Sequence, residues 1–157
     1  MTRLQTYENA AHVLSELISF HQELSDQYDS LAGKSSNALS ALLLQFMAER
    51  EKKLAVTLER YEESAPYKVL KTWIQIPYPE DLESFLGSLQ VEMTPDLEPE
   101  QVYELGSKVD GFVAGLLTHL QDSCAISEVK ALFKDLLKGE HDEGIALSKA
   151  YNSLREF

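Results

Sequence analysis

The chain has one cysteine in 157 residues, no long apolar run and no cluster of basic residues. Cys124 alone can form neither an intramolecular disulfide nor a cysteine-based metal site, which fits a reduced compartment. No apolar run approaches the ~20 residues of a membrane-spanning helix. The N-terminal residues also lack the pattern of a secretory signal. We therefore expect a cytoplasmic protein that does not enter a membrane.

Basic residues are scarce, with 14 Lys and Arg against 26 Asp and Glu and a formal net charge of -12. A chain of this charge repels nucleic acid and anionic membranes, so neither is expected as a partner. Glycines are few and scattered, which excludes a Gly-rich phosphate loop, and no serine or cysteine nucleophile constellation is visible. Metal-dependent chemistry is the one enzyme class left open.

Apolar residues recur with helical spacing in four long segments of the chain. We expect helices at residues 7–32, 36–63, 99–122 and 127–154, within a single domain spanning residues 1–157. The connections between the first and second helices and between the third and fourth are short. Each pair should therefore form an antiparallel hairpin.

All five prolines lie between Ser64 and Pro99, so residues 64–98 cannot form one continuous helix. We expect this crossover to pack on the bundle, with short helical turns near residues 67–73 and 79–89. Trp73 and its apolar neighbours could also form a patch for a protein partner, although covering the bundle is the commoner role.

This order of helices, with one long crossover between two hairpins, resembles the ferritin-like superfamily, and rubrerythrin-type proteins in particular. The resemblance implies an all-α, ferritin-like four-helix bundle in which the second and third helices are parallel. The run HQELSDQYDSLA is similar to a rubrerythrin first helix, where a Glu ligand precedes a Tyr by seven residues and an Ala by eleven. Here the same offsets from Tyr28 and Ala32 lead to His21.

The resemblance also implies a di-iron centre, with Glu-x-x-His on the second and fourth helices and one further Glu on each of the others. On the fourth helix the pattern corresponds to Glu140 and Glu143, so a glutamate replaces the histidine. On the third helix, counting from the pattern leads to Asp110, but the apolar stripe places Asp110 outward.

The second helix departs further from this pattern. Aligning the Glu-x-x-His motif to this helix by sequence alone selects Glu49 and Lys52, with Lys52 in place of the histidine. Both residues lie off the apolar stripe. The stripe instead places Arg50 at the centre of the inward face and Glu51 at its edge. Two other polar side chains, His12 and His141, lie off the stripes of their own helices, and we expect them in solvent.

The inward polar residues near the helix midpoints are His21, Arg50, Glu51, Glu140 and Glu143. A guanidinium repels a divalent metal and attracts carboxylates. We therefore expect Arg50 to bind Glu140 or Glu143, with His21 nearby, and no metal cofactor. The alternative is an iron or manganese ion held by His21, Glu51, Glu140 and Glu143.

These readings define two functional classes. The first is a non-catalytic structural, regulatory or protein-interaction module whose metal site has degenerated into a buried Arg-Glu cluster. The second is a metal-dependent oxidoreductase or iron-handling protein with an unusual carboxylate-rich site. We favour the first, and we expect a homodimer because helical bundles often pair through a flat face.

Overall fold

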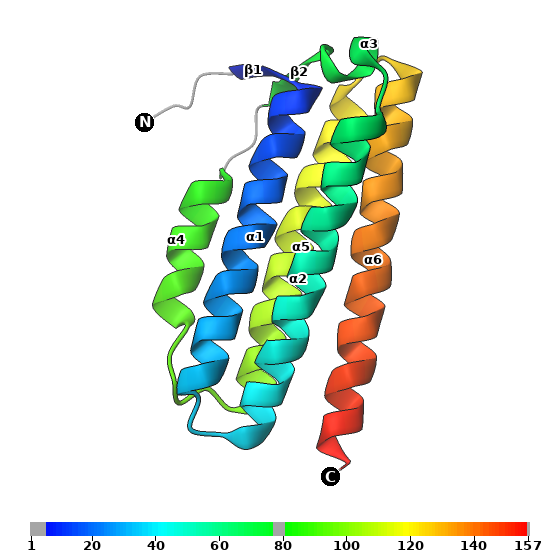
Figure 1. The fold of residues 1–157 in the computed structure, drawn as a ribbon. Helices are drawn as coiled ribbons and strands as arrows, with labels where there is room; N and C mark the ends of the chain where they lie inside the picture. Colours follow the sequence, from blue (N-terminus) through cyan, green and yellow to red (C-terminus); the bar gives the residue numbers. More distant parts are fainter. Residues whose placement is uncertain (1–5, 77–80, 157) are drawn as a thin grey trace.

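The computed structural model describes residues 6–76 and 81–156 of the chain. Four long helices lie side by side: α1 (Ala10–Lys34), α2 (Ala38–Ser64), α5 (Pro99–Ser123) and α6 (Ser127–Arg155). Figure 1 shows two antiparallel hairpins, α1 with α2 and α5 with α6, and it shows α2 and α5 running in the same direction. The predicted all-α ferritin-like bundle is confirmed.

Local capping determines where three of the long helices begin, namely α1, α2 and α5. The Asn9 side chain accepts a hydrogen bond from the backbone N–H of His12, so α1 starts at Ala10, three residues later than predicted. Asn37 caps α2 in the same way. The α5 helix begins with Pro99 behind a capping box formed by Glu98 and Gln101.

The crossover from α2 to α5 contains α3 (Tyr67–Leu70), β2 (Trp73–Ile76) and α4 (Leu82–Glu92). In Figure 1, α4 lies alongside α1 and returns the chain to the end of the bundle where α5 begins. The two helical turns predicted for the crossover correspond to α3 and α4, although residues 79 and 80 of the second turn lie outside the described part.

A small two-stranded sheet was not expected. The strand β1 (Thr6–Asn9) pairs antiparallel with β2, with Asn9 opposite Trp73. In β2, Trp73 is 66% exposed whereas the next residue, Ile74, is buried, which is the alternation of a strand. The strand has only four residues and lies in a proline-rich segment, so the two-residue alternation could not be recognised in the sequence. The sheet leaves the order and direction of the long helices unchanged.

The crossover packs on the bundle through an aromatic contact. The ring of Phe85 on α4 stacks on that of Phe112 on α5, with 3.9 Å between ring centroids, and it also lies near Phe20 on α1. In the bundle interior, α5 approaches α2 and α6 closely at Gly106, where a Cβ atom would lie 2.8 Å from Leu147 Cδ2 and 3.1 Å from Met47 Cε. No helix in the described part is both long and apolar enough to cross a membrane.

Candidate functional site

In the described part of the chain, four side chains of the His, Arg and Glu types are almost fully buried near the middle of the bundle, close to the buried Tyr28. The exposed fractions are 1% for His21 on α1, 2% for Arg50 and 0% for Glu51 on α2, and 5% for Glu140 on α6. His21, Arg50 and Glu140 lie on the apolar stripes of their helices and Glu51 lies at the edge of one, so the packing of neighbouring apolar residues places all four in the core. Buried charges are costly unless they are paired, so their contacts define the site.

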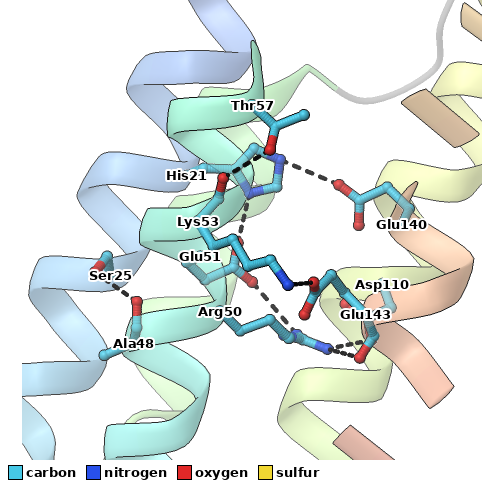
Figure 2. Close-up of polar contacts among 10 residues, drawn as sticks. All are labelled: His21, Ser25, Ala48, Arg50, Glu51, Lys53, Thr57, Asp110, Glu140 and Glu143. Atoms are coloured by element: carbon cyan, nitrogen blue, oxygen red, sulfur yellow. Dashed lines mark hydrogen bonds and ion pairs between the residues drawn. The ribbon is translucent and has the colours of Figure 1, made fainter. Parts of the chain in front are cut away.

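His21 bridges two glutamates from different helices. Its Nδ1 lies 2.5 Å from Glu51 Oε2, and its Nε2 lies 3.2 Å from Glu140 Oε1, as Figure 2 shows. Burial alone would lower the pKa of His21, but the charge of Glu51 and the hydrogen bonds to both carboxylates outweigh it and raise the pKa to about 10. His21 is therefore an imidazolium at neutral pH, and both ring N–H groups donate.

Arg50 forms the second half of the network. Its Nη1 donates to Asp110 Oδ2 at 2.8 Å and to the backbone carbonyl of Glu143 at 3.3 Å. Its Nη2 donates to Glu51 Oε1 at 3.4 Å. Burial opposes the charge, but the carboxylates of Glu51 and Asp110 keep the pKa of Arg50 above its ordinary value. Glu51 thus joins the two cations, and the network runs from Glu140 through His21, Glu51 and Arg50 to Asp110.

The expected ion pair between Arg50 and Glu140 or Glu143 was wrong, although Arg50 does contact the backbone carbonyl of Glu143. Arg50 binds the carboxylates of Asp110 and Glu51, not those of Glu140 or Glu143. The Glu143 carboxylate instead pairs with Lys53 at 2.9 Å, where Lys53 is 73% exposed and Glu143 13%. A glutamate at the edge of the inward face can turn toward a solvent-exposed lysine, which avoids the cost of burial.

The expected outward direction of Asp110 was also wrong. Its side chain is only 18% exposed and meets Arg50 across the α2–α5 interface. Burial raises the pKa of Asp110 to about 6, even though the Arg50 guanidinium acts to lower it. The third-helix ligand position of the ferritin-like pattern corresponds to Asp110, so the sequence did contain an indication that this residue faces inward. The apolar stripe correctly predicted the register of α2, because Glu49 and Lys52 are both exposed.

A separate group lies on the surface at the start of α1. His12 Nε2 is 2.8 Å from Glu16 Oε1 and 3.8 Å from Glu8 Oε1. Within the described residues, these three side chains are close enough together to hold one metal ion. The spacing of four residues between His12 and Glu16 on α1 could have revealed part of the group, whereas Glu8 lies in β1 before the helix. His12 was correctly expected to be exposed. Exposed groups of this kind are common in proteins without a metal.

The network makes stability depend on pH. The pKa of His21 rises from 6.5 to about 10 on folding, so its stabilisation is complete below pH 6.5 and is lost as the pH rises through about 10. We expect the free energy of unfolding to fall on the order of 4 kcal/mol across this window. The raised pKa of Asp110 acts in the same direction between pH 3.8 and about 6.

Chemical denaturation at a series of pH values measures this dependence. The loss above pH 6.5 should be much smaller in His21→Leu, whereas His12→Ala should retain the wild-type slope. Equal slopes for wild type and His21→Leu would show that His21 is not charged in the folded protein.

The parallel arrangement of α2 and α5, the long crossover and the inward carboxylates at the bundle centre together define the ferritin-like fold. A solved structure from Thermotoga maritima, described as that of a ferritin-like diiron-carboxylate protein, superposes with a TM-score of 0.60 and 14% sequence identity. The match covers 93% of this chain and 96% of the other. No family model and no curated protein matches the sequence.

Proposed function

We propose that this protein is a non-catalytic ferritin-like bundle, acting as a structural, regulatory or protein-interaction module. In this proposal a buried network of ion pairs occupies the centre of the bundle, where di-iron proteins of this fold hold their metals. The observation that carries the proposal is the pairing of Arg50 with both Glu51 and Asp110 at contact distance.

The residues of this site do not fit a di-iron centre. Glu51 is the inward glutamate of α2, but the residue three positions later is Leu54, where the ferritin-like pattern has a histidine ligand. A permanent guanidinium lies between Glu51 and Asp110 and would repel a divalent cation. Both nitrogens of His21 are bound to carboxylates, so neither is free to ligate a metal.

The alternative function is a metal-dependent oxidoreductase or an iron-handling protein that uses iron or manganese. It is favoured by the carboxylate-rich centre and by the description of the Thermotoga structure. In this alternative His21, Glu51, Glu140 and Glu143 would be the ligands. His21 would first have to lose a proton and Glu143 its contact with Lys53, which is why we rank it second.

The proposed module would act through its surface. We propose a cytoplasmic homodimer, and a protein partner that binds the crossover near the exposed side chains of Trp73 and Tyr67. The acidic balance of the chain disfavours nucleic acid and anionic membranes as partners. Size-exclusion chromatography with light scattering tests the dimer, and Trp73→Ala tests whether a captured partner binds at this end of the bundle.

The proposal predicts that the purified protein contains no stoichiometric iron, manganese or zinc at the bundle centre. Elemental analysis should give well under one metal per chain in wild type. Any metal found should be lost in His12→Ala, which removes the surface group, and retained in a Glu140→Ala, Glu143→Ala double variant. One or more metals per chain that disappear only in the double variant would make the iron-handling alternative the better account.

A further inference from the structure

A cavity of about 340 Å³ leads from the surface to the ion-pair network. Its mouth includes the exposed residues Asp135, Lys138 and Asp142 on α6. Its inner end includes His21 and Glu140, both more than nine-tenths buried. The walls between mouth and end are mainly apolar. They include Leu17, Leu54, Leu58, Val113, Leu117 and Leu136.

The shape and lining of this cavity suit a small ligand with an apolar body. Ligand sites are typically concave and apolar with a few well-placed polar groups, and they begin at about 300 Å³. Here the polar groups at the inner end are charged, so the charge of the network decides which head group would be accepted.

With His21 protonated and the three carboxylates ionised, the buried network carries one more negative charge than positive. His21 and Arg50 supply two positive charges, whereas Glu51, Asp110 and Glu140 supply three negative ones. The Glu143 carboxylate is matched separately by Lys53. One additional positive charge at the bundle centre would therefore balance the network.

Glu140 is the carboxylate best placed to receive this charge. Glu51 contacts both His21 and Arg50, and Asp110 contacts Arg50 at 2.8 Å. Glu140 contacts His21 through Oε1 at 3.2 Å, and a carboxylate can accept several further hydrogen bonds. Of these three carboxylates, Glu140 is the one that lines the cavity. Both nitrogens of His21 already donate, so the inner end offers acceptors rather than donors.

We propose that this cavity is a binding site for a primary alkylamine, with the ammonium group on Glu140 and the alkyl chain against the leucines of the wall. The aliphatic chain replaces water along an apolar surface, which favours binding. The ammonium forms a charge-assisted hydrogen bond in a partly desolvated position. At the mouth, Asp135 and Asp142 outnumber Lys138, so the approach also favours a cation. This inference uses the same network as the proposed function.

The test compares hexylamine with hexanoate and hexanol at pH 7 by calorimetric titration and by thermal unfolding. The three probes share a chain length and differ in the charge of the head group. Hexylamine, which is protonated at this pH, should bind and raise Tm with concentration, whereas hexanoate and hexanol should not. Preferential binding of hexanoate would assign the head group to His21 and overturn the proposal, as would the absence of binding by hexylamine.

The glycine on the cavity wall provides the sharpest variant. A Cβ atom at Gly139 would meet nothing within 4 Å, so Gly139→Leu should fold and place its side chain in the cavity. It leaves Glu140 and His21 in place but should abolish hexylamine binding. Gly111→Leu is the matched control, because Gly111 is also an uncrowded helical glycine and does not line this cavity. If both variants bind hexylamine equally, the amine binds to carboxylates on the surface and not in the cavity, and the proposal is wrong.

A charge variant tests the assigned head-group contact. Glu140→Gln keeps the shape of the side chain and should weaken hexylamine binding about tenfold or more, because a charged hydrogen bond is lost. The exposed Glu49→Gln should bind as wild type does. Unchanged affinity in Glu140→Gln would overturn the contact. If the protein contains no metal and does not bind hexylamine, this inference is wrong but the proposed function stands. If a metal is bound at Glu140 and Glu143, the proposed function is wrong.

Discussion

Replacing Arg50 by alanine should lower the free energy of unfolding by about 3–5 kcal/mol. The substitution leaves Asp110 without its guanidinium and Glu51 with His21 alone, so carboxylate charge remains in a desolvated position. For a chain of this length, Tm should fall by roughly 10 °C. Thermal and urea unfolding measure the effect.

Two comparisons separate a buried charge from a lost packing contact. Arg60→Ala removes an exposed arginine from the same helix and should change stability by less than about 0.5 kcal/mol. The double variant Arg50→Met, Asp110→Leu removes both charges and should cost far less than Arg50→Ala. Arg50 Nε and Asp110 Oδ1 find no hydrogen-bond partner in the described part, which favours the apolar pair further. A silent Arg50→Ala would show that Arg50 is solvated.

The second large effect is expected for His21→Leu, which should also cost about 3–5 kcal/mol. Glu51 keeps its contact with Arg50, but Glu140 loses the cation that neutralises it inside the bundle. The leucine fills the space of the imidazole, so the cost reports the charge and not a cavity. Chemical denaturation at pH 7 provides the measurement.

Removing Glu140 together with His21 should recover much of this stability. The double variant His21→Leu, Glu140→Leu leaves Glu51 paired with Arg50 and introduces no unpaired charge at this end of the network. It should be more stable than His21→Leu alone. If the double variant is the less stable of the two, Glu140 does not depend on His21 for its stability in the core.

Sequence periodicity predicted most of the residues that enter the core, although not Asp110, because an apolar neighbour one turn away places a side chain on the inward face. Met47 and Leu54 do this for Arg50, and Leu17 and Leu24 for His21. The ferritin-like topology followed from the lengths of the connections for a similar reason, since a short turn leaves two helices only one way to pack.

Periodicity could not predict which charges pair. Arginine and lysine have long, flexible side chains. A position on a helix therefore determines where the Cα atom lies, but it does not determine where the charged group at the end of the side chain lies. Arg50 reaches Asp110 on α5, and Lys53 reaches from solvent to Glu143 on α6. Which charges pair depends on how α2, α5 and α6 are spaced and rotated relative to one another. The apolar stripe of a single helix does not carry this information. The same limit hid the cavity, which forms only when α1, α2, α5 and α6 are assembled.

We propose that ion pairs, and not metal ions, balance the charge at the bundle centre. Thermal unfolding of the His12→Ala variant, in chelator and then with excess Fe²⁺ or Mn²⁺ under anaerobic conditions, tests this most directly because the surface group has been removed. A metal at 100 times its Kd would add about 2.7 kcal/mol and raise Tm by several degrees. We predict the same Tm in chelator and in metal. A rise with metal in His12→Ala that disappears when Glu140→Gln is added would contradict the claim.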